Sequence, residues 1–224
     1  MNKIVVVIPV YNEEKTIGKV IQNLKKEDYN NIIVVDDGST DRTYDIVKKE
    51  GVSLYRHIIN RGLGGALNTG ITAALNEGAD IIVTFDADLQ HDVNDIKKLL
   101  YYIEHGYDVA IGNRLTKGLN KGMPFIRRIG IRGLDFITYL LFGAYVCDSQ
   151  SGLRMFNKEA AFKLDIRTNR MEVSSEIIKE IKRNKLKLKE VPIKAIYTDY
   201  SLSKGNTVWN GFGIVFKLLL RRIM

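Results

Sequence analysis

The sequence predicts an α/β protein in which a mostly parallel central sheet is flanked by helices within a single domain. The chain has 224 residues, a length that suits one domain with a substantial buried core. Apolar residues make up 45% and charged residues 27%, as in ordinary soluble globular proteins. In the first half, short apolar runs rich in β-branched residues alternate with segments of helical periodicity. This alternation is typical of βαβ units, which build parallel sheets.

Strands and helices are predicted to alternate through the first half. Continuous short apolar runs, as in buried parallel strands, place strands at 3–8, 31–36, 52–56, 80–85 and 107–112. Between them, apolar residues three or four positions apart predict helices. The first helix follows a candidate N-cap at Asn12 and carries one apolar face, formed by Ile17, Val20, Ile21 and Leu24. The other helices are expected at about 41–50, 64–76 and 93–103.

The second half is less regular, and it begins with a basic segment. Residues 115–134 contain five cations and no acidic residue. An apolar helical stretch is expected from there to about 146, followed by a strand at 152–156, a helix at 174–183 and a strand at 186–197. The change in composition predicts two halves of one domain, at about 1–112 and about 113–206. A final amphipathic helix is predicted at 207–224.

Composition and charge exclude several classes of protein. Cys147 is the only cysteine, which excludes an internal disulfide framework and a cysteine-based zinc site. The net charge of +8 permits nucleic acid, an anionic membrane surface or phosphorylated small molecules as partners. The chain contains no recognisable nucleic-acid-binding module, so we expect no nucleic-acid partner. It also lacks an apolar run of about 18 residues, so we expect no membrane-spanning helix.

Polar clusters follow three of the predicted strands at the point where each strand ends. They lie at 9–13, 36–41 and 86–90. Ligands bind at the carboxyl ends of parallel strands, because helix N-termini and short loops converge there. Turn and capping chemistry alone would explain any one of these clusters. Three clusters on one edge of the sheet favour a binding site.

Asp86 and Asp88 are the sharpest of these features, because they are two positions apart and directly follow a buried strand. Two buried carboxylates at this spacing repel each other unless a cation neutralises them. Oxygen ligands without a nearby cysteine favour Mg²⁺ or Mn²⁺, and Gln90 adds a neutral oxygen. The sequence therefore predicts a divalent-cation site at this edge.

Two further segments each have two interpretations. The glycine-rich stretch 61–66 matches neither the dinucleotide fingerprint nor the P-loop. It is either a loop entering a closely packed helix or a point where backbone approaches a nucleotide or sugar. The cations of 115–134 could neutralise a phosphate acceptor or anionic lipid head groups. The histidines show no metal-ligand spacing and are interpreted as ordinary surface or loop residues: His57, His91 and His105.

The chain contains, in this order, the motifs VVIPVYNEE, VVDDGSTDRT, GLGGALNTG, FDADLQHD, GNR and DSQSGLRMF. Together they resemble the inverting family-two glycosyltransferases with the GT-A fold. The most similar branch contains dolichol-phosphate mannose synthase and bacterial polyprenyl-phosphate sugar transferases. The resemblance runs from about residue 4 to 204 and implies one GT-A-type, Rossmann-like domain at 1–206. The half at about 1–112 would bind the nucleotide sugar, and the half at about 113–206 would bind the acceptor.

The resemblance implies a role for each residue that matches a family motif. The residues implied for donor binding are Pro9, Tyr11, Glu13, Asp36, Asp37, Asp86 and Lys204. Those implied for a metal on the donor diphosphate are Asp86, Asp88 and Gln90. Those implied for the acceptor phosphate are Arg114, Arg127, Arg128, Arg132 and Arg154. The reaction centre is implied to contain Asp88, Arg114 and Asp148.

The resemblance also implies the reaction and the partners. A hexose would move, with inversion, from a UDP- or GDP-sugar to dolichyl or undecaprenyl phosphate, with Mg²⁺ or Mn²⁺ as cofactor. The enzyme would be cytoplasmic and peripheral on the cytoplasmic face of a membrane, with an accessory membrane subunit or a second copy as a further partner. The C-terminal helix would carry Trp209 to the lipid head groups, unless it packs on the protein's own core. The stretch 136–146 would form a second such surface.

Three other functions are weighed against this one. A sugar hydroxyl on a cell-surface glycan would need a general base, for which Asp148 is the candidate. A phosphate monoester, with a second pKa of about 6, needs none; both acceptors stay open, although the excess of arginines over candidate bases favours phosphate. A nucleotidyltransferase would need a glycine-rich, lysine-containing loop after the first strand, which the chain lacks. A non-catalytic metal-binding regulator would leave the second half of the chain unexplained.

Overall fold

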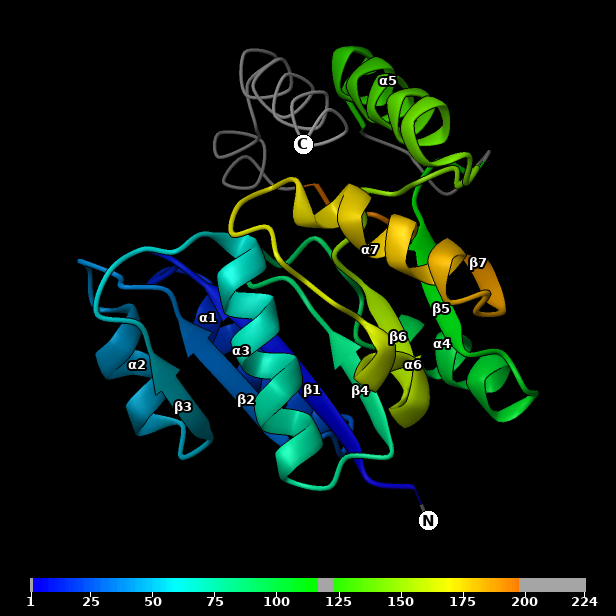
Figure 1. Ribbon diagram of the computed structural model, residues 1–224. Coiled ribbons are helices and arrows are strands. Elements are labelled where there is room, and N and C mark those ends of the chain that lie inside the picture. Colours follow the sequence, from blue (N-terminus) through cyan, green and yellow to red (C-terminus); the bar gives the residue numbers. More distant parts are fainter. Residues whose placement is uncertain (1, 117–122, 198–224) are drawn as a thin grey trace.

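The computed structural model describes residues 2–116 and 123–197, which form a seven-stranded sheet with helices on both faces (Figure 1). The strands lie in the order β3-β2-β1-β4-β6-β5-β7. Their bounds are β1 Ile4–Val10, β2 Ile32–Asp36, β3 Ser53–Arg56, β4 Ile81–Thr84, β5 Val109–Asn113, β6 Arg154–Asn157 and β7 Leu188–Pro192. The predicted α/β class and the mostly parallel sheet are confirmed.

The direction of β6 sets the geometry of the site. Strands β1 to β4 pair in parallel, and so do β5 and β7, whereas β6 is antiparallel to both of its neighbours, β4 and β5. An antiparallel strand begins at the edge where its neighbours end. The segment 148–153, which precedes β6, is thereby brought to the same edge as the ends of β1, β2, β4 and β5.

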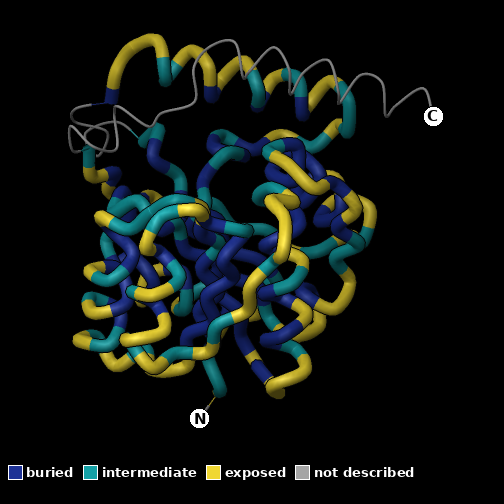
Figure 2. The backbone as a smooth tube through the Cα atoms, turned by 90° about the vertical axis from the view of Figure 1, so that its left-hand side faces the viewer, coloured by how far each residue is buried: buried dark blue, intermediate teal, exposed yellow. Residues whose placement is uncertain are grey.

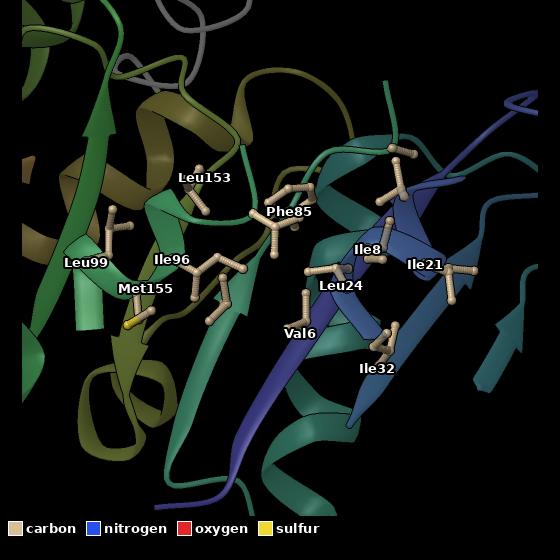
Figure 3. Close-up of a cluster of buried hydrophobic side chains, with 14 of the residues drawn as sticks. Val6, Ile8, Ile21, Leu24, Ile32, Phe85, Ile96, Leu99, Leu153 and Met155 are labelled. Atoms are coloured by element: carbon tan, nitrogen blue, oxygen red, sulfur yellow. The ribbon is translucent and has the colours of Figure 1, made fainter. Parts of the chain in front are cut away.

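Helices cover both faces of this sheet. The described helices are α1 Ile17–Lys26, α2 Thr43–Lys49, α3 Leu63–Asn76, α4 Asp95–Glu104, α5 Phe125–Phe142, α6 Lys158–Lys163 and α7 Val173–Arg183. Side chains of β1 alternate between two clusters: Val6 and Ile8 pack with α1 and α4 (Figure 3), whereas Val5 and Val7 pack with α3, α6 and α7. Because both faces are buried, the strands read as continuous apolar runs.

α5 lies outside these layers and packs against α7 (Figures 1 and 2). Three of its residues are buried, namely Ile131, Asp135 and Thr138. The hydroxyl of Thr138 lies 2.8 Å from that of Ser175 on α7. Asp135 Oδ1 accepts from the N–H and the hydroxyl of Ser149, at 2.9 and 2.6 Å. α5 is therefore attached through a narrow polar strip, while most of its surface faces solvent.

Three elements differ from their predictions. α5 begins at Phe125, so the arginines of the basic segment lie within the helix that was expected to follow them. α6 was not predicted, because it is short; Asn157 caps it by accepting the N–H of Ala160 at 2.7 Å. β7 ends at Pro192 instead of near 197, since proline cannot donate to a strand ladder.

The predicted C-terminal helix and Lys204 lie outside the described residues. Within the described part of the chain, no helix combines the length and the apolar composition that crossing a membrane would require.

Candidate functional site

Asp37, just after β2, holds a loop in place. Its Oδ1 accepts from His57 Nδ1 at 2.6 Å and from the N–H of Arg61 at 2.9 Å, and its Oδ2 accepts from the N–H of Gly62 at 2.6 Å. The side chain is 4% exposed. Both oxygens accept hydrogen bonds from loop 57–62, so Asp37 holds that loop in place. Its contact with the donor base stays a prediction. His57, expected to be an ordinary surface or loop residue, lies in this loop, is partly buried and takes part in the arrangement.

The other donor-side candidates divide into accessible and buried positions. Tyr11 is 45% exposed beyond the end of β1. Pro9 and Glu13, close by, are partly buried. Asp36 is fully buried and lies 3.3 Å from Arg56 Nε. The predicted donor contact of Asp36 stays a prediction.

The glycine-rich stretch packs on another part of the chain. A Cβ atom on Gly64 would lie 1.9 Å from the carbonyl oxygen of Thr168, and one on Gly62 would lie 2.5 Å from that of Asn169. The N–H of Gly65 donates to the Asn169 carbonyl at 3.1 Å. These glycines allow two loops to touch backbone to backbone. The geometry therefore favours the packing interpretation over close approach to a nucleotide.

Asp86 and Asp88, which follow β4, respond to each other's charge. Burial raises the pKa of Asp88, and the charge of Asp86 adds to the increase. Burial also opposes the charge of Asp86, but a hydrogen bond and the charge of His91 outweigh it. Two nearby cations, Arg114 and Arg154, act in the same direction, so the pKa of Asp86 lies below its usual range. A divalent cation would relieve the repulsion within this pair.

The carboxylate pair fits a hard cation shared with a ligand. The side chain of Asp86 is 32% exposed, and Asp88 is partly exposed. Among the described residues, no group of three or more His, Cys, Asp or Glu side chains could hold a metal ion by itself. Mg²⁺ is usually bound by one or two carboxylates together with substrate phosphates. The oxygen chemistry and the accessibility of the pair match that arrangement.

Gln90 links Asp88 to the start of α5. Its side-chain N–H donates to Asp88 Oδ2 at 2.5 Å, and its Oε1 accepts from Arg127 Nη2 at 3.0 Å. The oxygen predicted to bind a metal is therefore engaged with Arg127. Gln90 would become a metal ligand only after exchanging this partner.

His91 is a site residue that the sequence analysis missed. Its side chain is fully buried, and its Nε2 lies 3.3 Å from Asp86 Oδ2. The ring packs edge-on against Phe85, with centroids 5.7 Å apart. The expectation of an ordinary surface or loop residue is wrong, because the chain after Asp88 folds back against the end of β4. The sequence feature that could have identified His91 as a site residue is its position within the FDADLQHD motif, five residues after Asp86.

Arg114 and Asp148 form a buried ion pair. Arg114 Nε donates to Oδ2 and Nη2 to Oδ1 of Asp148, both at 2.8 Å. The two side chains are 5% and 0% exposed. Burial opposes the charge of Arg114, but the pair raises its pKa above the usual value. Arg114 Nε and Nη2 and both Asp148 oxygens are engaged in this pair. The predicted roles of Arg114 at the acceptor phosphate and of Asp148 at the reaction centre stay predictions.

Several buried guanidinium nitrogens lack a protein acceptor. Within the described residues these are Arg127 Nη1, Arg128 Nε and Arg154 Nε. Burial lowers the pKa of Arg154 to about 10, so the residue stays charged near pH 7. Unpaired buried donors are rare in proteins. Each of these donors has room for a hydrogen-bond acceptor that the described chain does not supply. Arg132, the remaining acceptor-side candidate on α5, is exposed.

Asp135 predicts a pH dependence of stability. Burial raises its pKa to about 6, although hydrogen bonds from Ser149 act in the opposite direction. An aspartate with a raised folded-state pKa stabilises the fold fully below its unfolded-state pKa of about 3.9. This contribution disappears as the pH rises through about 6, a loss of up to about 3 kcal/mol by pH 7.

Asp135→Asn should therefore flatten the fall in unfolding free energy between pH 4 and 7. Urea denaturation at both pH values measures the effect, with Asp92→Asn, at a partly exposed aspartate, as the matched control. Equal pH dependence in wild type and Asp135→Asn would contradict the assignment.

Comparison with known proteins shows the family to which the chain belongs. The family model described as glycosyl transferase family 2 matches residues 5–163. An uncharacterized protein of Methanocaldococcus jannaschii is 56% identical over 99% of this chain and 93% of its own length. The UDP-N-acetylglucosamine–dolichyl-phosphate N-acetylglucosaminyltransferase of Methanococcus voltae is 44% identical over 98% of this chain and 96% of its own.

A solved structure shows the same fold. Glucosyl-3-phosphoglycerate synthase from Mycobacterium tuberculosis, in complex with Mn²⁺, UDP-glucose and phosphoglyceric acid, matches with a TM-score of 0.74. The match covers 99% of this chain and 79% of that one, at 20% identity. The predicted GT-A fold is thereby confirmed.

Proposed function

The chain belongs to glycosyl transferase family 2 and is a glycosyltransferase, and on this premise we propose that it transfers a hexose from a nucleotide-diphosphate sugar to a polyprenyl phosphate. The pairing of Asp148 with Arg114 carries the proposal. Asp148 was the candidate base for a sugar hydroxyl acceptor, and both of its oxygens are engaged. A phosphate monoester needs no such base, because it is mostly dianionic near pH 7. The arrangement therefore favours phosphate over a glycan hydroxyl.

The unpartnered arginine nitrogens give the second line of support. An acceptor phosphate would provide Arg127 Nη1 and Arg128 Nε with the hydrogen-bond acceptor that these two atoms lack. Arg154 acts electrostatically on Asp86. It would stabilise negative charge as it develops on the leaving diphosphate. Attack from the face opposite that leaving group inverts the anomeric configuration.

Asp86 and Asp88 would hold the divalent cation, with Gln90 as a third ligand once it leaves Arg127. When bound, the cation would supply Lewis-acid stabilisation of the leaving diphosphate. The likeness to a fold solved with Mn²⁺ and UDP-glucose supports a cation of this class. Tyr11, Glu13 and Pro9 remain the proposed donor contacts at the end of β1.

A UDP-sugar is the first donor to test, because the Methanococcus voltae relative is named for UDP-N-acetylglucosamine and dolichyl phosphate. A bound ligand stabilises the fold by about 2.7 kcal/mol at a hundred times its dissociation constant. Thermal unfolding should be compared with UDP-N-acetylglucosamine, UDP-glucose and GDP-mannose, each with and without Mn²⁺. We expect one donor to raise the melting temperature, and to do so only with Mn²⁺. No increase with any donor would contradict the nucleotide-sugar assignment.

Arg127→Ala and Arg128→Ala should each raise the KM for dolichyl phosphate more than they slow donor hydrolysis. A hydrogen bond to a charged group contributes about 1.5–3 kcal/mol, or roughly ten- to hundredfold. Steady-state kinetics with varied lipid and a parallel assay of nucleotide release measure the two effects. Arg183→Ala, on α7 with its side chain 50% exposed, is the matched control. Equal losses in both assays would place these arginines at the donor site or in the structural framework.

The apolar surface of α5 supports the membrane part of the proposal. Large side chains that are 47–71% exposed form what we call the α5 apolar face: Phe125, Ile126, Ile129, Phe136, Tyr139 and Leu140. Figure 2 shows exposed residues recurring along α5. Soluble monomers rarely expose so much contiguous apolar surface. With Arg128 and Arg132 on the same helix, the face suits an anionic lipid surface, and the proposal places it on the cytoplasmic leaflet.

Phe136→Glu combined with Leu140→Glu should abolish co-sedimentation with anionic vesicles. Two buried anions at the lipid boundary oppose insertion and repel the head groups. The control is Phe162→Glu, at an 81% exposed phenylalanine on α6. Unchanged vesicle binding would contradict the assignment. A reduced particle size in solution instead would show that a second copy covers the face, and restored binding with an added membrane protein would assign it to an accessory subunit.

A further inference from the structure

The carboxylate of Asp86 lies directly against the backbone of Gly152. A Cβ atom on Gly152 would lie 2.0 Å and 2.1 Å from the two carboxylate oxygens, far inside the 3.0 Å that real Cβ atoms respect. Gly152 is not among the residues with positive φ. Its backbone conformation therefore does not require glycine. Glycine is required at this position because the Asp86 carboxylate takes the space that a Cβ atom would need.

Thr84 fixes the position of Gly152. It is the last residue of β4, is 2% exposed, and donates from its hydroxyl to the Gly152 carbonyl at 2.8 Å. The rest of β4 is apolar, and a buried hydroxyl destabilises the fold unless it is hydrogen-bonded. This hydroxyl ties the strand that leads into Asp86 to the segment that packs against its carboxylate.

His91 contacts the same carboxylate from the loop that follows it. Its Nε2 lies 3.3 Å from Asp86 Oδ2, and its fully buried ring is held by Phe85. Gly152 and His91 together limit how the carboxylate can turn, while 32% of the Asp86 side chain stays exposed. The carboxylate is thus contacted on two sides and remains open to solvent on another.

We propose that Gly152, Thr84 and His91 are positioning residues that orient Asp86 toward the divalent cation and the donor diphosphate. The inference rests on the proposed function, which assigns Asp86 to the metal. Mg²⁺ demands near-ideal ligand geometry, and residues that orient a ligand typically alter metal affinity ten- to hundredfold. Gly152 and Thr84 thus serve the site, although neither would touch the cation.

Mn²⁺ affinity in the presence of UDP, and separately of GDP, tests the proposal by calorimetry without any acceptor. Thr84→Val keeps the shape of the side chain and should weaken Mn²⁺ binding about ten- to hundredfold, whereas Thr84→Ser keeps the hydroxyl and should bind nearly as wild type. His91→Phe keeps a buried aromatic ring and should weaken binding as Thr84→Val does. Wild-type affinity in Thr84→Val would overturn the proposal.

Thermal unfolding without metal tests the contact between Gly152 and Asp86. Gly152→Ala should lower the melting temperature by several degrees in the wild-type background and by about one degree or less in Asp86→Ala. An equal decrease in both backgrounds would overturn the contact. Unchanged Mn²⁺ affinity in Asp86→Ala would instead refute the metal assignment of the proposed function. If Gly152→Ala does not fold, the Mn²⁺ affinities of Thr84→Val and Thr84→Ser still test the proposal.

Discussion

Asp88→Asn is expected to lower sugar transfer by about a thousandfold while leaving the fold intact. The substitution removes a carboxylate proposed to bind the cation, which is worth several kcal/mol in the transition state, at about 1.4 kcal/mol for each tenfold. It also removes a charge whose burial, together with repulsion from Asp86, raises the pKa of Asp88. The unfolding free energy without metal should therefore not decrease. Initial rates across a Mn²⁺ titration, with circular dichroism of both proteins, measure the two effects.

The matched control is Asp92→Asn, which makes the same chemical change in the segment that follows. Asp92 accepts from the N–H of Asn94 and has no contact with Asp88 among its hydrogen bonds. It should retain wild-type turnover and chelator sensitivity. If Asp88→Asn kept both as well, the metal assignment would be incorrect.

Arg114→Ala is expected to destabilise the fold by about 3–5 kcal/mol, the usual effect of leaving a buried charge without its partner. The variant would leave Asp148 fully buried and would remove two side-chain hydrogen bonds of 2.8 Å. Transfer activity should be lost with the fold of the site. Chemical denaturation measures the decrease in unfolding free energy.

Two variants separate this effect from a general loss of charge. Arg42→Ala removes an arginine that pairs with Glu14 but is 82% exposed, so little change is expected. Arg114→Met with Asp148→Leu removes both charges and should recover much of the stability without recovering activity. If Arg114→Ala unfolds no more easily than Arg42→Ala, the ion pair contributes less than its burial implies.

The sheet and the carboxylate pair could be predicted because both follow from local pattern. Strands covered on both faces read as apolar runs, and their alternation with helices placed the ends of β1, β2 and β4 on one edge. The positions of Asp86 and Asp88 at that edge followed directly. The α5 segment is harder to predict, because the sequence suggests a basic segment followed by an apolar helix, whereas one helix carries both kinds of residue.

The partners of the buried charges could not be predicted, because they depend on contacts between distant parts of the chain. Arg114 and Asp148 are 34 residues apart and meet because β6 runs antiparallel to β5. No local sequence pattern predicts the direction of β6. The motif that predicts donor binding by Asp37 gives no sign that its oxygens also accept hydrogen bonds from a loop more than twenty residues away. His91 likewise became a site residue only through the way the chain folds back against β4.

Transfer to a matched pair of lipids tests the central claim most directly. Dolichyl phosphate and dolichol differ only in the phosphate group. The account proposes that the arginines bind this phosphate and that Asp148, whose oxygens are engaged, does not activate a hydroxyl acceptor. The pair of lipids therefore tests the choice of acceptor. The enzyme should be given the labelled nucleotide sugar that stabilises it most, with Mn²⁺, and the product examined by nuclear magnetic resonance. The account predicts label in dolichyl phosphate alone, with the anomeric configuration of the donor inverted. Label in dolichol, or a product that retains the donor configuration, would contradict it.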